Sequence, residues 1–186
     1  MAIKRLDHIV VVVEYLAPAV AFFTALGMEV EGEMPVEGEW VDRINGIADV
    51  RVDIVMLRIP DGQGKLELTR FRSPALAPLT PAVAPPNALG LRSVMFAVDD
   101  VDAAVATLQA HGGELMGEVV QYENLYRLCY LRGPAGIIVA ARSPVPTWAL
   151  RVWLISACCF SSCIAIRRER STDIALMRFL SWDRSS

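Results

Sequence analysis

Hydrophobic and polar residues follow the same order of patterns twice along the chain. Apolar runs at 9–13 and 94–98 predict strands, and each run precedes a stretch in which apolar residues recur at helical spacing. Gly27 and Gly112 close these stretches, at the place where a helix commonly ends in a left-handed residue. Three further strands are predicted in each copy, at 28–33, 50–59 and 65–71 and at 114–121, 126–131 and 136–141. Each copy therefore predicts a βαβββ unit.

The two copies align without a gap at an offset of 85 residues, with 6–33 on 91–118. Identical pairs include Ala19/Ala104, Gly27/Gly112 and Gly32/Gly117. Because these pairs fall in the helix, at its end and in the next strand, the match indicates a duplicated unit. Five prolines between 72 and 89 predict an extended linker that joins the two modules.

Composition narrows the class of protein. The 186 residues are 54% hydrophobic and 21% charged, which excludes a disordered or fibrous chain. The formal net charge of −3 argues against nucleic-acid binding, because such proteins need a basic face to replace counterions along the phosphates. The N-terminus lacks the successive basic, apolar and cleavage regions of a secretory signal, so we expect a cytoplasmic protein.

The character of the chain changes near residue 143. Residues 1–143 carry a net charge of −6 and residues 144–186 a net charge of +3, and three of the four cysteines lie in the second part. The uncharged run 152–166 is shorter than the ~20 residues that a membrane-spanning helix needs. A packed helix, a marginal membrane anchor and a non-native extension from an altered reading frame all fit this tail. We favour the last and expect a poorly packed tail without site residues or membrane contact.

The sequence resembles the vicinal oxygen chelate superfamily in four features. These are the paired βαβββ units, the motif LDHI at 6–9, the motif LEL at 66–68 and the segment 90–105. That superfamily includes glyoxalase I, extradiol dioxygenases, fosfomycin-resistance enzymes and bleomycin-resistance proteins. The resemblance covers residues 4–143. It implies an α+β fold in which modules 4–71 and 90–143 form an eight-stranded open cup.

In that superfamily the first and last strands of both modules supply metal ligands. The resemblance implies that His8 and Glu67 bind a divalent metal, for which Zn, Ni, Mn, Fe and Co suit this donor pair, and that Glu67 is the catalytic base. In the second copy Ser93 aligns with His8, and Ala140 aligns with Glu67, or Val139 with a shift of one residue. Two protein ligands are fewer than the usual three of a catalytic zinc site, so a further donor is required.

The sequence does not decide which other residues complete the site. Candidate extra donors are Tyr122, Glu123, Tyr126 and Asp53. Candidate substrate-binding residues are Trp40, Arg127, Tyr122 and Tyr126. Arg127 binds a substrate carboxylate or phosphate if it points into the cup, and it is an ordinary surface charge if it points outward. His111, beside Gly112, is expected to cap its helix instead of binding a ligand.

Two functions are compatible with these residues. The first is a glyoxalase-like protein that binds a small polar organic substrate in its cup, with a divalent metal for lyase or isomerase chemistry. The second is a metal-free protein that binds a small molecule, similar to the bleomycin-resistance proteins, in which the acidic segment 29–42 attracts a cationic ligand. A homodimer in which a second chain completes the ligand set is compatible with the first function.

Overall fold

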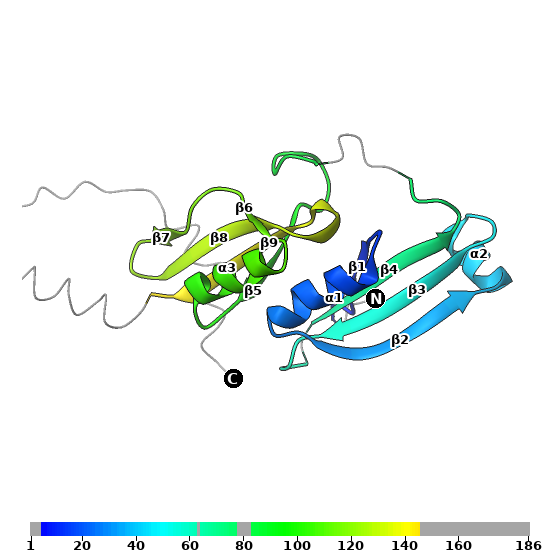
Figure 1. Cartoon of the computed structure of the whole chain (residues 1–186), viewed down its shortest axis with the longest axis horizontal. Coiled ribbons are helices and arrows are strands. Elements are labelled where there is room, and N and C mark those ends of the chain that lie inside the picture. Colours follow the sequence, from blue (N-terminus) through cyan, green and yellow to red (C-terminus); the bar gives the residue numbers. More distant parts are fainter. Residues whose placement is uncertain (1–4, 63, 78–82, 146–186) are drawn as a thin grey trace, which may run out of the picture. The chain divides into compact units, whose positions relative to one another are not determined.

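A computed structural model describes residues 5–62, 64–77 and 83–145 (Figure 1). The chain divides into two units, 1–146 and 147–186, and all described residues belong to the first. Of the predicted tail, only residues 144 and 145 are described, and its run 152–166 lies outside the described residues. None of the helices in the described part is long and apolar enough to cross a membrane.

The first copy forms a four-stranded sheet. In chain order its elements are β1 (Ile9–Val12), α1 (Leu16–Ala25), β2 (Glu29–Glu37), α2 (Glu39–Asn45), β3 (Arg51–Arg58) and β4 (Lys65–Ser73). The strand order is β1-β4-β3-β2, in which β1 runs parallel to β4 and the other neighbours are antiparallel. Helix α1 buries Phe22 and Phe23 in the same core as Leu57 and Leu68, on one face of this sheet.

The second copy repeats this topology. Its elements are β5 (Ser93–Ala97), α3 (Val101–Ala110), β6 (Glu114–Leu115), β7 (Val120–Tyr122), β8 (Tyr126–Arg132), a 3₁₀ turn (Pro134–Gly136) and β9 (Ile138–Pro144). The order is β5-β9-β8-β6, with β5 parallel to β9 and with β7 also paired to β8. The duplicated α+β fold predicted from the sequence is confirmed.

The two ends of α3 are set by Asp100 and by His111 with Gly112. Asp100 is the N-cap of α3, and its carboxylate accepts hydrogen bonds from the backbone N–H groups of Asp102 and Ala103. His111 is the C-cap of the same helix, and its Nδ1 lies 2.9 Å from the carbonyl oxygen of Thr107. Gly112 follows with φ of +85°, a conformation that favours glycine.

Two elements differ from the predicted pattern. The strand predicted at 28–33 continues to Glu37 and leads into the short helix α2, which the sequence pattern did not reveal. Val41 of this helix packs on Val50 and Val52, and the Asp42 carboxylate accepts hydrogen bonds from the backbone of residues 49 and 50. The strand predicted at 114–121 is instead split into β6 and β7, both paired to β8.

Candidate functional site

His8 and Glu67 meet on the first sheet. Val10 pairs with Glu67 in the parallel register of β1 and β4, and His8 lies two residues before Val10, so both side chains lie on one face. The Nε2 atom of His8 is 3.5 Å from Oε2 of Glu67. The two side chains are 32% and 17% exposed, so the pair is reachable from solvent.

Asp7 and Thr69 contact the atoms of His8 and Glu67 that do not face each other. Nδ1 of His8 lies 3.0 Å from Oδ2 of Asp7, and the ion pair of Asp7 with Arg5 is 2.9 Å long. Hydrogen bonds from His8 and then from Arg5 lower the pKa of the Asp7 carboxyl. The buried Thr69 hydroxyl donates a 2.7 Å hydrogen bond to Oε1 of Glu67. Asp7 and Thr69 were not singled out from the sequence, although Thr69 follows Glu67 by two residues on the same strand face.

The tautomer of His8 follows from these contacts. An ionised carboxylate only accepts hydrogen bonds, so the Asp7 contact places the hydrogen of a neutral imidazole on Nδ1. The lone pair of Nε2 then faces a carboxylate oxygen of Glu67 at 3.5 Å. Two acceptor atoms in this arrangement repel each other unless a cation or a proton lies between them. The geometry therefore suits a positive charge shared by His8 and Glu67.

The second copy lacks this pair. In the β5–β9 register Met95 pairs with Ala140, just as Val10 pairs with Glu67 in the first copy. Since Val10 and Met95 are equivalent at the offset of 85, the register selects Ala140 and not Val139 as the counterpart of Glu67. Ala140 is fully buried. Within the described residues, no three His, Cys, Asp or Glu side chains group as a metal site.

The candidate extra donors lie in other contacts. Asp53 pairs with Arg72 at 3.3 Å on the first sheet. Tyr122 and Tyr126 stack on each other with ring centroids 5.4 Å apart, across the antiparallel pair β7–β8. Glu123 lies in the turn between these strands with φ of +47°. These contacts join the candidate donors to residues other than the predicted metal ligands.

Arg127 and Trp40 also lie apart from the pair. Arg127 alternates along β8 with the core residues Cys129 and Leu131, and it forms a two-pronged ion pair with Asp102 of α3. The hydrogen bonds that Arg127 donates to the Asp102 carboxylate raise the pKa of its guanidinium. This is the arrangement in which Arg127 does not point into the cup. Trp40 lies on α2 and is 62% exposed.

The sheet faces opposite α1 and α3 carry exposed apolar side chains, and we call them the open faces. On the first sheet Val10 and Val12 share the face of Glu67 and are 49% and 44% exposed. On the second sheet Met95 and Tyr130, the two strand partners of Ala140, are 48% and 43% exposed. A ligand on an open face would therefore contact apolar groups beside the polar pair.

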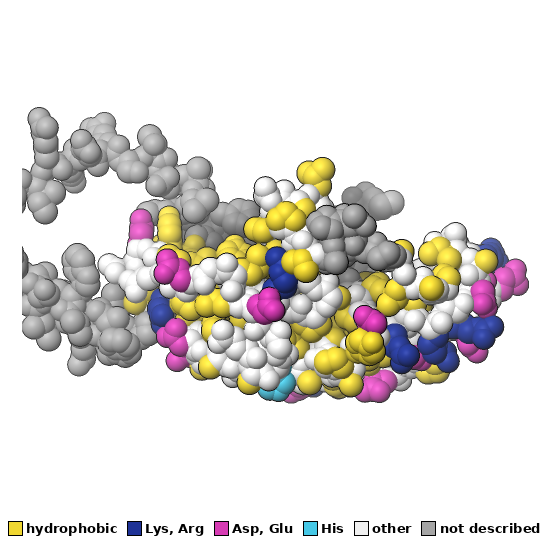
Figure 2. Space-filling view, turned by 45° about the horizontal axis from the view of Figure 1, so that its top comes forward, with side chains coloured by type: hydrophobic (Ala, Val, Ile, Leu, Met, Phe, Trp, Pro, Cys, Tyr) yellow, Lys and Arg dark blue, Asp and Glu magenta, His cyan; other side chains and the backbone are white. Residues whose placement is uncertain are grey.

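Three of the six acidic side chains in the segment 29–42 form ion pairs with basic side chains of the neighbouring strands. Glu29 pairs with Arg58, Glu31 lies 2.7 Å from Lys65, and Glu37 lies 3.7 Å from Arg72. Figure 2 shows acidic and basic side chains interspersed at the end of the molecule that carries α2. These ion pairs weaken the field that a cationic ligand would meet along this segment.

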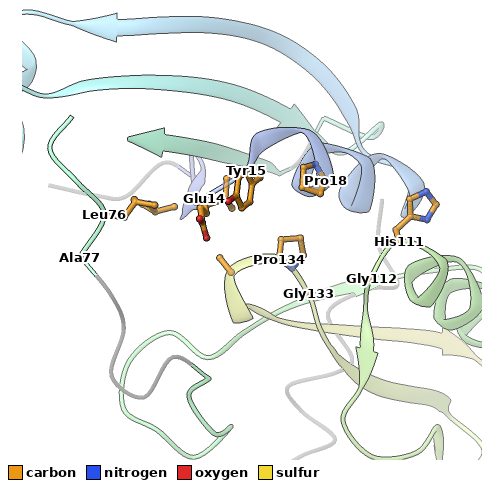
Figure 3. Close-up of a pocket in the computed structure, with 12 residues that line it drawn as sticks. Glu14, Tyr15, Pro18, Leu76, Ala77, His111, Gly112, Gly133 and Pro134 are labelled. Carbon is orange, nitrogen blue, oxygen red and sulfur yellow. The ribbon is translucent and has the colours of Figure 1, made fainter. Parts of the chain in front are cut away.

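Two cavities lie near or between these elements. One of about 570 Å³ is lined by Asp7 and Lys65, the neighbours of His8 and Glu67, together with Arg5, Leu6, Gly62 and Gly64. A larger one of about 810 Å³ lies beside the start of α1, the end of α3 and the 3₁₀ turn (Figure 3). Glu14, Tyr15 and His111 line it, and a hydrogen bond to Glu14 raises the pKa of the Tyr15 hydroxyl. It contains none of the predicted site residues.

Comparison with known proteins agrees with this fold. The model of the glyoxalase/bleomycin resistance protein/dioxygenase superfamily matches residues 5–140. A crystal structure of a glyoxalase family protein from Bacillus cereus is 44% identical, with a TM-score of 0.75, over 78% of this chain and 97% of that one. The uncharacterized protein YaeR of Escherichia coli K12 is 29% identical over 74% of this chain and 94% of its own.

A more distant structure, a mutant of glyoxalase I from Zea mays, shares the fold. It is 19% identical with a TM-score of 0.53, over 74% of this chain and 45% of that one. The duplicated βαβββ topology, the strand-register match between the copies and the family match over most of the described residues lead to one conclusion. The chain belongs to the glyoxalase/bleomycin resistance protein/dioxygenase superfamily.

Proposed function

We propose that this protein binds a small polar organic molecule on the open face of its first sheet, with a divalent metal ion held by His8 and Glu67. The observation that carries the proposal is the 3.5 Å approach of Nε2 of His8 to Oε2 of Glu67, two acceptor atoms that need a cation or a proton between them. Ligand atoms that bond one ion at about 2.0–2.2 Å lie within roughly 4 Å of each other. The separation of this pair fits that limit.

Asp7 and Thr69 would position the two ligands. Asp7 keeps the hydrogen of His8 on Nδ1 and thus leaves Nε2 as the metal-binding atom. Thr69 holds Oε1 of Glu67 and directs Oε2 toward His8. The exposed side chains of Val10 and Val12 would bind the apolar part of the same molecule.

The chemistry proposed for this site is of the lyase or isomerase type. When bound, the metal would supply Lewis-acid polarisation of neighbouring oxygen atoms in the substrate. Glu67 is the carboxylate placed to take a proton from the substrate. A carboxylate that also binds a metal is a weaker base, and the second copy offers Ala140 where another glutamate would act. We therefore expect slow turnover when one chain supplies the whole site.

The second candidate function is metal-free binding of a small molecule. It is favoured by Ser93 and Ala140, which leave the second copy without metal ligands at the equivalent positions. In that case a proton would lie between His8 and Glu67, and the pair would bind polar groups of the ligand directly. A homodimer, which we propose for the metal-dependent function, would bring donors of a second chain to complete the ligand set.

Metal binding by the full chain separates these functions. The protein is stripped with a chelator, dialysed and titrated by calorimetry with Zn²⁺, Ni²⁺, Mn²⁺ and Co²⁺, and bound metal is then measured by elemental analysis. We expect one ion per chain in the wild type and its loss in His8→Ala and in Glu67→Gln. His111→Gln is the matched control, because the chain has two histidines and His111 lies at the end of α3.

Two results would count against a metal at His8 and Glu67. A folded wild type that binds none of the four ions supports the metal-free function. Equal binding by the wild type and the His8→Ala/Glu67→Gln double variant would place the metal elsewhere in the chain. Light scattering with and without metal measures the dimer independently of this result.

A further inference from the structure

The edges of β1 and β5 enclose a third, smaller cavity. Each of these strands has a hydrogen-bonded neighbour on one side, β4 for β1 and β9 for β5. The cavity has a volume of about 280 Å³. Its walls come from residues 9–12, 91–94 and 135–138, together with Ala84. These walls are apolar apart from Arg92, Ser93 and backbone groups, and the described residues that line the cavity include no Asp or Glu.

Arg92 lines this cavity, and its side chain also carries an unsatisfied donor. Its Nε atom is buried, and it meets no hydrogen-bond acceptor within the described part of the chain. Other arginines of the two sheets are paired: Arg58 with Glu29, Arg127 with Asp102, and Arg132 with two backbone carbonyls. Buried N–H donors without an acceptor are rare in folded proteins. Arg92 therefore points to a partner that the described residues do not supply.

The repeat shows that this position has the opposite charge in the other copy. At the offset of 85, Arg92 and Ser93 correspond to Asp7 and His8. Asp7, His8 and Glu67 together suit a cation, whereas Arg92 and Ser93 offer hydrogen-bond donors beside Ala140. These positions of the first copy therefore suit a cationic ligand, and the corresponding positions of the second copy suit an anionic ligand.

We propose that the cavity between β1 and β5 binds the oxyanion of a small organic acid, a carboxylate or a phosphate, through Arg92 and Ser93. The planar guanidinium presents parallel N–H donors that match both kinds of oxyanion. The Ser93 hydroxyl supplies a further donor, and the valine and isoleucine walls accept a short apolar chain. This site goes beyond the function proposed for His8 and Glu67 and does not depend on a metal there.

The test is a titration of the full-length protein with acetate, butyrate and inorganic phosphate. Binding is followed in ¹H–¹⁵N spectra through the Nε–Hε signals of the arginines, and affinities are confirmed by calorimetry. We expect a saturable shift of the Arg92 signal. Arg92→Gln should weaken binding about 10- to 100-fold, because it removes charge-assisted hydrogen bonds. Arg92→Lys should retain part of the affinity, since lysine keeps the positive charge but lacks the parallel N–H donors of the guanidinium.

Three comparisons make the result specific. Arg43→Gln, on the exposed surface of α2, should bind the anions as the wild type does. The His8→Ala/Glu67→Gln double variant should also bind them unchanged, so failure of the metal proposal does not imitate failure of this one. Tighter binding of butyrate than of acetate identifies a carboxylate with an apolar chain as the ligand, and tighter binding of phosphate identifies a phosphate.

Either of two results overturns the proposal. One is the absence of saturable binding for all three anions, which would leave a bridging water as the partner of Nε. The other is equal affinity in the wild type and in a folded Arg92→Gln variant, which would place the anion elsewhere.

Discussion

Phe22 joins the two copies of the fold, and its contact with Gly133 gives a sharp test of the structure. Phe22 lies fully buried on α1, and Gly133 precedes the 3₁₀ turn of the second copy. A Cβ atom at Gly133 would lie 3.0 Å from Cζ and 3.1 Å from Cε1 of the Phe22 ring. Gly133 has φ of −109°, which any residue adopts, so the backbone adds no strain to Gly133→Ala.

Gly133→Ala is therefore expected to lower the free energy of unfolding, because it overpacks the core around Phe22. Ordinary carbon contacts lie at 3.4–4 Å, so the ring has to move by a few tenths of an ångström within close-packed surroundings. We expect Gly133→Ala to lower the free energy of unfolding by about 1–3 kcal/mol, measured by urea unfolding of the full chain. Phe22→Leu removes the ring edge, so the double variant should be more stable than the sum of the two single changes predicts, by about 1 kcal/mol or more.

Gly113 provides the matched comparison. A Cβ atom there would lie 3.1 Å from Cε2 of Phe22 but only 2.9 Å from the backbone oxygen of Leu108. A backbone oxygen cannot yield as a side chain does, so Phe22→Leu should relieve Gly113→Ala much less. Additive effects of Gly133→Ala and Phe22→Leu, within about 0.5 kcal/mol, would refute the contact between Phe22 and the second copy.

Two further variants and the reactivity of Cys129 test single interactions. Asp100→Ala removes the N-cap of α3 and should cost about 1 kcal/mol in urea unfolding, a loss that Asp100→Asn should largely avoid. Asp7→Asn should weaken Zn²⁺ binding about 10- to 100-fold in calorimetry, while a small effect would show that Asp7 does not position His8. Burial raises the pKa of the Cys129 thiol, so its tryptic peptide should resist alkylation in the native state, and rapid labelling at neutral pH would contradict this. Because the unfolded thiol ionises first, Cys129 should also make the free energy of unfolding fall as the pH rises above its ordinary pKa of 9.0.

The fold was predictable because its strongest signals are local and occur twice. The apolar runs and the helix-ending Gly27 and Gly112 each reflect a requirement of one backbone segment, and the structure places all of them as predicted. Helix α2 was missed because its seven residues are stabilised through distant contacts. Those contacts are the packing of Val41 on Val50 and the hydrogen bonds of Asp42 to the following loop.

The site was predictable only in part, for a related reason. Alternation along a strand divides residues between two faces, but it does not say which charged group will find a partner. The direction of Arg127 stayed open from the sequence, and in the structure Arg127 shares the face of the core residues Cys129 and Leu131. Its partner Asp102 lies 25 residues away in the sequence, and that contact became visible only in the folded chain. The orphaned Nε of Arg92 likewise depends on what surrounds it.

The duplicated backbone explains why the two copies can differ so strongly in chemistry. Both copies keep the same parallel register, so each position on one open face has a counterpart on the other. Thr69, which supports Glu67, corresponds to Arg142, just as Val12 corresponds to Ala97. Ala140 is fully buried, where a carboxylate would lose its water without the hydroxyl that Glu67 receives from Thr69. The position that supports Glu67 with a hydroxyl in the first copy therefore carries an arginine in the second, so one backbone register presents different chemistry in the two copies.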